Sequence, residues 1–301
     1  MCTINMRTNS LPTTINGGFD TLLSRLTPSS AETSSFSSHR QSVSAKLQAS
    51  LGVSNFFRTG SAGNGTSIRY YSDVDFFASI PSQNQRNDSA YMLRIVKEVL
   101  QERFPSTDIH IDTPAVVCEF GSDGAEKIEV VPAYYVEKDE GTGFNIYNIP
   151  AVGGGWMRSG PKVHNAYVTG INNSLSSKVK PLIRFMKAIK YYNNIPISSF
   201  YLELRIAKWA ATESSIVYPF DVRTVLRNLV STGLPRMIDP AGISGYVAAA
   251  HTETYRQDAL SKLNTALNRA NHAIEEEQAG RTATAYDYWD KVFNGRFPAY
   301  G

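Results

Sequence analysis

The spacing of apolar residues changes along the chain, and this change restricts the fold more than any other feature of the sequence. Before about residue 136, short alternating stretches such as "DVDFFASI", "DIHIDTPAVVCEF" and "KIEVVPAYYVE" are typical of strands. From about residue 176, apolar residues recur every three or four positions, as in "SSKVKPLIRFMKAIKYYNN", which is typical of packed helices. We therefore predict an α+β protein in which a sheet lobe with flanking helices precedes a helical lobe.

Three divisions of the chain follow from this pattern. Residues 1–40 contain the Ser/Thr-rich stretch "TPSSAETSSFSSHR" and are predicted to form a partly flexible N-terminal segment. Residues 41–175 are predicted to form the sheet lobe and residues 176–301 the helical lobe. The Gly- and Asn-rich segment 137–173, with "GGGW" near its centre, is predicted to be a loop or lid between them. The cleft between the two lobes is therefore the expected ligand site.

Charge and cysteine content restrict the partners. Thirty Lys and Arg against 27 Asp and Glu give a net charge of only +3, so no overall field indicates a nucleic acid or membrane partner. Two cysteines cannot form a disulfide framework, and neither has zinc-site neighbours. The sequence has no signal-peptide pattern and no run of about 20 apolar residues. We expect a monomer in a reducing cytoplasm.

A glycine cluster, "GSAGNGT", resembles a phosphate-binding loop without its lysine. Gly60 and Gly65 have the P-loop spacing, but Thr66 stands where that loop needs Lys. The helical spacing of apolar residues from Gln41 onward predicts that the cluster follows a helix, whereas a P-loop follows a strand. Gly60 and Ser61 are nevertheless suited to hold outer phosphates, through close backbone approach and a hydroxyl.

Carboxylates stand at three positions on two predicted strands. Asp73 and Asp75 are two apart, so their side chains leave the same face of a strand, and Glu129 has apolar neighbours on a strand expected in the same sheet. Each of them alone is typical of a turn or a solvated strand. Together they predict a site for two Mg²⁺ ions, for which Mn²⁺ is a possible substitute, and a phosphoryl-transfer reaction.

A basic helix and the helix after it supply further candidates. The first of these helices carries a row of cations, which could equally be a solvated face: Lys180, Arg184, Lys187 and Lys190. In the next helix, Ser199 could meet a phosphate, and Phe200 or Tyr201 could stack on a base, although aromatic residues at this spacing are more often core. His164 is the one histidine singled out, and a structural role is expected for it.

These motifs resemble those of a known enzyme family. Gly60-Ser61, an eleven-residue gap, Asp73-Val-Asp75 and later "IEV" around Glu129 are similar to the signature of DNA polymerase β-like nucleotidyltransferases. The stretches "LIRFMKAIKYYNN", "ISSFYLE" and "AYDYWDKVFNGRFP" more closely resemble the bacterial CD-NTases, the cyclic GMP-AMP synthase-like and DncV-like enzymes also called SMODS nucleotidyltransferases. The resemblance runs from about residue 41 to the end of the chain.

The resemblance implies a two-lobed fold with a mixed sheet, and an enzyme that joins NTPs with release of pyrophosphate. The product would be a cyclic oligonucleotide, a second messenger that activates a separately encoded effector in anti-phage defence. The resemblance implies metal binding by Asp73, Asp75 and Glu129, and phosphate binding by Gly60 and Ser61. It implies that Lys187 or Lys190, with Ser199, contacts the donor triphosphate and that Phe200 or Tyr201 stacks on a base. The residues that it suggests for reading the base are Asn165, Asn172 or Asn173. A zinc-ribbon insertion has no counterpart, so DNA activation is not expected.

Two alternatives remain open at this level. A nucleotidyltransferase that makes a linear product, or adenylylates another acceptor, would have the same metal site. A nucleotide-binding module without activity would require that the three carboxylates do not converge.

Overall fold

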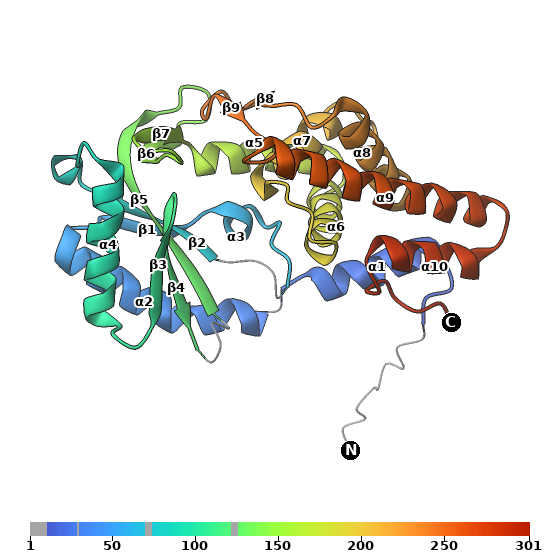
Figure 1. Ribbon diagram of the computed structural model, residues 1–301, viewed down its shortest axis with the longest axis horizontal. Helices are drawn as coiled ribbons and strands as arrows, with labels where there is room; N and C mark the ends of the chain where they lie inside the picture. The colour runs from blue at the N-terminus through green and yellow to red at the C-terminus, as the bar shows by residue number, and fades with distance from the viewer. Residues whose placement is uncertain (1–10, 29, 70–73, 122–125) are drawn as a thin grey trace, which may run out of the picture.

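The computed structural model describes residues 11–28, 30–69, 74–121 and 126–301, and of residues 30–37 it describes the backbone. Figure 1 shows a sheet lobe and a helical lobe side by side, with α5 and α6 where they meet. This two-lobed α+β architecture confirms the predicted fold class. None of the helices in the described ranges combines the length and the apolar composition needed to span a bilayer.

The sheet is mixed, and one pairing in it is parallel. Its strands run in the order β1 (Asn55–Arg58), β2 (Val74–Ile80), β5 (Glu126–Lys138), β4 (Ala115–Phe120) and β3 (Asp108–Asp112). The long strand β5 continues into a pairing with β6 (Asn145–Pro150), which pairs in turn with β7 (Trp156–Ser159). Strands β2 and β5 are parallel, and the remaining pairs in this sheet are antiparallel.

The two faces of this sheet have different environments. One face packs on α2 (Ser30–Leu51) and α4 (Ser89–Arg103), with buried residues that alternate along the strands, among them Phe76 and Val130. The opposite face has a small apolar cluster that includes Phe77 and Val131. Because successive strand residues alternate between faces, Asp75 and Glu129 share this second face with Phe77 and Val131.

The helical lobe contains the larger core. It is built from α1 (Ile15–Leu26), α5 (Pro161–Ser174), α6 (Val179–Tyr192), α7 (Ser199–Ala210), α8 (Tyr218–Thr232), α9 (Glu253–Gln278) and α10 (Thr282–Val292). The helical lobe also contains the ribbon of β8 (Met237–Ile238) with β9 (Tyr246–Val247), whereas the short helix α3 (Gly60–Asn64) and a 3₁₀ turn at Ser82–Asn84 belong to the sheet lobe.

The N-terminal segment differs from its prediction. Phe19 of α1 is fully buried, and its ring contacts Phe185, Trp289 and Phe297, so α1 packs in the helical core beside α10 (Figure 1). Most of the predicted flexible stretch has a helical backbone, because α2 begins at Ser30. Local composition indicated a linker, but tertiary packing and continuation into an amphipathic helix decided the conformation.

Three further predictions are corrected by the structure. The glycine cluster follows strand β1, not a helix, since α2 ends at Leu51 and β1 occupies Asn55–Arg58. The predicted lid 137–173 is a strand pair followed by α5, with three consecutive glycines at positive φ in the turn between β6 and β7. The stretch "DIHIDTPAVVCEF" forms the two antiparallel strands β3 and β4 rather than a single strand.

Candidate active site

A cleft of about 510 Å³ lies between the two lobes. The sheet lobe lines it with Gly60, Ser61, Asp75, Phe77 and Val131, and the helical lobe with Lys187, Tyr191, Ser199, Phe200 and Glu203. Asn165 and His164 of α5 also line it. Seven residues predicted for the site from the sequence therefore meet in one cleft, although they come from five separate elements: Gly60, Ser61, Asp75, Asn165, Lys187, Ser199 and Phe200.

Gly60 is required by the close approach of Asp75. Thr59 donates its backbone N–H to the Asp75 carbonyl oxygen at 2.9 Å, which places the start of α3 against β2. Gly60 has φ of +54°, and a Cβ atom there would lie 1.9 Å from Oδ2 of Asp75. No side chain fits at this distance, so the glycine lets the loop contact the carboxylate directly.

Asp75 and Glu129 are direct register partners on the parallel strands β2 and β5. Neighbouring strands are about 4.8 Å apart, so two carboxylates on one face at matching positions lie close together. Glu129 also forms an ion pair with Lys127 at 3.8 Å and is not part of the cleft lining. Asp73 lies outside the described residues. The hard oxygen donors of Asp75 and Glu129 fit a divalent cation such as Mg²⁺.

Within the described ranges, which do not include Asp73, no three His, Cys, Asp or Glu side chains are grouped as metal ligands. The described pair, Asp75 and Glu129, therefore supplies two of the three carboxylates predicted from the sequence. The prediction that all three bind metal stays a prediction.

Lys187 is buried and serves the glycine loop. Its side chain is 1% exposed, and its ammonium donates to the Glu203 carboxylate. Glu203 also accepts hydrogen bonds from Asn64 Nδ2 at 2.9 Å and Thr66 Oγ1 at 2.6 Å. Burial alone would raise the pKa of Glu203, but the Lys187 charge and these hydrogen bonds outweigh it and lower the pKa. This network ties α6 and α7 to the loop after α3.

The four cations on α6 have separate environments. Arg184 donates to the carbonyl oxygens of Gly65 at 2.8 Å and Ser67 at 3.2 Å, so it holds the same loop as Lys187. Lys180 donates to Thr169 of α5 at 2.9 Å. Lys190 donates to Ser199 Oγ at 2.6 Å, at the start of α7. The predicted solvated face is thus partly buried, and Lys190 with Ser199 is the pair placed together as expected.

The structure separates two sets of alternatives for contacts with a base. Phe200 lines the cleft and is 38% exposed, whereas Tyr201 is fully buried and donates its hydroxyl to the Pro235 carbonyl oxygen at 2.9 Å. Asn165 lines the cleft, whereas Asn172 is buried and its side-chain oxygen accepts the Lys180 backbone N–H at 3.0 Å. Asn173 is exposed on α5 and is not part of the cleft lining.

Two acidic residues at or beside the cleft are absent from the sequence predictions. Glu203 stands in the apolar pattern "SFYLELRIAKWA", and an acid at a core position of a helix was the available signal, because such an acid needs a buried cation. Asp239 has a fully buried side chain and contacts His164 Nε2 at 2.7 Å. No local pattern pairs residues 75 positions apart.

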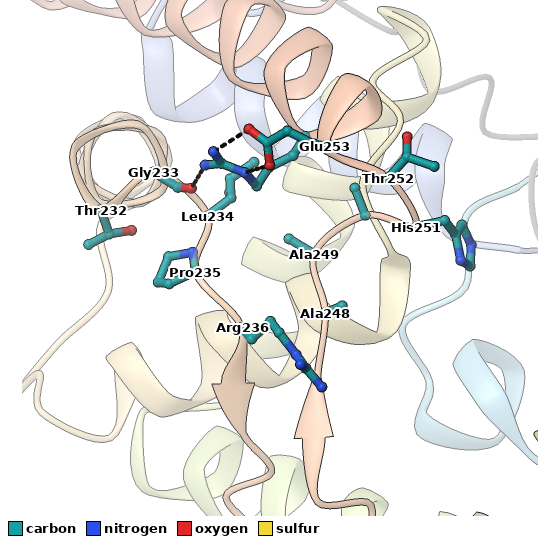
Figure 2. Close-up of a pocket in the computed structure, with 12 residues that line it drawn as sticks. Thr232, Gly233, Leu234, Pro235, Arg236, Ala248, Ala249, His251, Thr252 and Glu253 are labelled. Atoms are coloured by element: carbon teal, nitrogen blue, oxygen red, sulfur yellow. Dashed lines mark hydrogen bonds and ion pairs between the residues drawn. The ribbon is translucent and has the colours of Figure 1, made fainter. Parts of the chain in front are cut away.

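A second cavity, of about 670 Å³, lies between α8, the β8–β9 ribbon and the start of α9 (Figure 2). Arg256 lines this cavity, and its guanidinium donates to the Glu253 carboxylate and to the Gly233 carbonyl oxygen. Its walls are joined to α7, since Ser198 donates its N–H to the Ala249 carbonyl oxygen at 2.7 Å. Asp75 and Gly60 do not line this cavity.

Residues 14–172, more than half of the chain, match the family model for the Second Messenger Oligonucleotide or Dinucleotide Synthetase domain, SMODS. This stretch includes Gly60, Asp75 and Glu129, and the match confirms the predicted family. The chain belongs to the SMODS family. It is a nucleotidyltransferase of the CD-NTase type.

Individual SMODS relatives are distant in sequence but similar in fold. A Bacillus cereus protein described as a probable cyclic nucleotide synthase is 23% identical over 257 residues, covering 79% of this chain and 75% of that protein. The structure of Escherichia coli CdnC with ATP superposes with a TM-score of 0.73 at 18% identity, covering 94% of this chain and 98% of the other. Vibrio cholerae DncV with the linear intermediate pppA(3′,5′)pG gives a TM-score of 0.73 at 12% identity, covering 92% and 94%.

Proposed function

We propose that this SMODS protein is a Mg²⁺-dependent synthase that joins NTPs into a cyclic di- or trinucleotide. One observation carries the proposal. Gly60 packs against Asp75, the register partner of Glu129, and both line the same cleft as Ser199, whose hydroxyl accepts a hydrogen bond from Lys190. A loop suited to hold phosphates, one of the two paired carboxylates and a hydroxyl bonded to a cation thus line one cleft.

The residues of this chain would divide the work by position. Gly60 and Ser61 offer backbone and hydroxyl groups to the outer phosphates. Asp75 and Glu129, with Asp73, would hold divalent cations, which when bound activate a hydroxyl and stabilise the leaving oxygens. Lys190 and Ser199 would steady the triphosphate, and the exposed ring of Phe200 would stack on the base. Lys187, whose charge is paired with Glu203, would support the loop rather than touch the phosphates.

The reaction would proceed by successive nucleotidyl transfers. A 3′- or 2′-hydroxyl oxygen bonds to the α-phosphorus of an NTP, and the bond from that phosphorus to the pyrophosphate oxygen breaks. A second transfer within the linear product closes the ring. DncV with a linear intermediate bound supports this order by analogy. We further propose that the product activates a separately encoded effector in anti-phage defence.

The decisive experiment analyses the product. The purified full chain is incubated with Mg²⁺ or Mn²⁺ and all four NTPs, treated with phosphatase, and examined by mass spectrometry. A phosphatase-resistant oligonucleotide, absent with Asp75→Asn, is the expected result. Oligonucleotides that lose terminal phosphates to the phosphatase would instead establish the linear alternative. Binding of NTPs without any pyrophosphate release would establish a nucleotide-binding module.

A further inference from the structure

The loop between β8 and β9, residues 239–245, contacts the sheet lobe and lines the cleft through Ser244. We call it the ribbon loop. Ile243 at its tip packs with Ile146 of β6 and Val163 of α5, so a residue of the helical lobe completes a small apolar cluster on the sheet lobe. A Cβ atom at Gly160 would lie 3.3 Å from Ile243, which shows how closely the loop contacts the junction of β7 and α5.

Asp239 organises the ribbon loop through its carboxylate. The side chain is fully buried and accepts backbone N–H groups from Ala241 at 2.9 Å, Ile243 at 3.1 Å and Ser244 at 2.8 Å. It also contacts His164 Nε2 at 2.7 Å. Four partners satisfy the buried carboxylate, and one of them lies on another element, α5.

His164 transmits this contact to the cleft. It is 5% exposed, and its ring meets the ring of Phe200 edge-on, with centroids 5.0 Å apart and planes at 85°. Edge-to-face packing of this kind fixes the orientation of an aromatic ring. Phe200 and Ser244 both line the cleft. Phe200 is connected to Asp239 through His164, and Ser244 donates its own backbone N–H to the Asp239 carboxylate. Asp239 therefore controls two cleft residues without lining the cleft itself.

The lining of the cleft also has a part that differs in chemistry from the loop of Gly60 and Ser61. Phe200, Met157 and Pro161 give it aromatic and apolar walls, and Ser244 adds a hydroxyl. A planar aromatic ring with polar edges fits such walls, whereas a triphosphate fits the loop of Gly60 and Ser61. The nucleobase of the bound NTP is thus the ligand group expected here.

We propose that Asp239 and His164 are positioning residues that set nucleobase selection by holding Phe200 and Ser244, an inference that rests on the proposed NTP-binding role of this cleft. In the resting protein, the ribbon loop fixes the Phe200 ring before a nucleotide enters. Loss of the Asp239 contact frees that ring and the Ser244 hydroxyl, so that different bases become less well distinguished.

The test compares ligands with and without a base. Dissociation constants for ATP, GTP, CTP, UTP and inorganic tripolyphosphate are measured by calorimetry for the wild-type full chain and for Asp239→Asn. We expect Asp239→Asn to weaken binding of the preferred NTP about five- to tenfold, as a misaligned base stack would. The dissociation constants of the four NTPs should also differ less from one another than they do in the wild type. Tripolyphosphate, which has no base, is expected to bind equally to both proteins.

Two further variants complete the design. Ile243→Ala loosens the ribbon loop and keeps the buried pair of Asp239 and His164. It is expected to weaken NTP binding in the same way and serves as the test if Asp239→Asn fails to fold. Ile238→Ala changes an exposed neighbour, 61% accessible, and is the matched control expected to bind like wild type. Equal NTP affinities in wild type, Asp239→Asn and Ile243→Ala would overturn the inference, as would parallel loss of tripolyphosphate binding. Wild-type protein that binds no NTP would instead contradict the proposed function.

Discussion

The two walls of the cleft are built in different ways. On the sheet wall, strand register places Asp75 beside Glu129, and the backbone hydrogen bond from Thr59, just after β1, to Asp75 of β2 places Gly60. On the helical wall, residues of α5, α6 and α7 are held by buried polar pairs, Lys187 with Glu203 and His164 with Asp239. A sheet positions side chains through its repeating backbone geometry, whereas helices need specific side-chain contacts to fix their mutual position.

This difference predicts how each wall fails. Changes on the sheet wall should remove chemistry while the fold persists, because the functional carboxylates contribute little to packing. Changes on the helical wall should lower stability first, because a buried charge without its partner is costly. The four predictions below test this contrast, in order of decreasing effect.

The largest effect is expected from the carboxylates of the sheet wall. Asp75→Asn, alone or with Asp73→Asn, should lower NTP turnover on the order of ten thousandfold, as loss of a central catalytic group does. The unfolding free energy should stay constant or rise slightly, since a repulsive pair is removed. Pyrophosphate release and urea unfolding measure both quantities. Asp112→Asn, an exposed aspartate of β3, is the control, and turnover retained by Asp75→Asn would remove Asp75 from the mechanism.

The buried pair of the helical wall should have the next largest effect. Glu203→Gln keeps the size of the side chain but leaves the Lys187 ammonium, 1% exposed, without a counter-charge. The unfolding free energy should fall by about 3 to 5 kcal/mol. Lys187→Met combined with Glu203→Gln removes both charges and should recover part of the loss. A Glu203→Gln variant as stable as wild type would show that this pair does not hold the helical wall.

Two glycines of one loop separate contact from backbone strain. Gly60 and Gly65 have φ of +54° and +68°, but a Cβ atom at Gly65 would meet nothing within 4 Å. Both alanine variants should lose about 1 to 2 kcal/mol of stability through the left-handed backbone. Gly60→Ala should in addition displace Asp75 and reduce turnover about a hundredfold. Equal turnover by the two variants would mean that the Gly60 contact with Asp75 does not matter for catalysis.

The smallest effect concerns acid stability. Burial would raise the pKa of Asp239, but the hydrogen bond and charge of His164 and the backbone N–H groups lower it from 3.8 to about 2. The carboxylate therefore contributes about 2 kcal/mol above pH 4, and this is lost as the pH falls toward 2. The stability difference between wild type and Asp239→Asn should narrow over that range in urea unfolding. A constant difference would contradict this assignment.

Sequence patterns predicted the sheet wall better than the helical wall. The Asp-x-Asp pattern and the apolar neighbours of Glu129 predicted two carboxylate strands of one sheet, and β2 and β5 are direct neighbours in it. The glycine loop was assigned correctly to the cleft, but its preceding element was wrong, because the four residues of β1 are too few to show alternation. Because a strand precedes the loop, the preceding element no longer argues against a P-loop. The missing lysine and the contact of Gly60 with Asp75 still argue against one.

The helical wall depended on contacts that no local pattern contains. The spacing of cations on α6 could not show that Lys187 is buried against Glu203 while Lys190 meets Ser199. Nor could it show that Phe200 faces the cleft and Tyr201 the core. Adjacent residues on a helix point about 100° apart, so a small rotation exchanges their roles.

The sequence by itself determined the family, the order of the sheet and helical lobes, and the residue types available for metal and phosphate binding, because hydrophobic period and side-chain chemistry are local properties. The tertiary structure decided which of those residues share the cleft. It placed α1 in the helical core, replaced the predicted lid with β6, β7 and α5, and joined His164 to Asp239 across the chain. These outcomes depend on burying apolar surface and pairing charges between distant segments, which only the folded chain brings together.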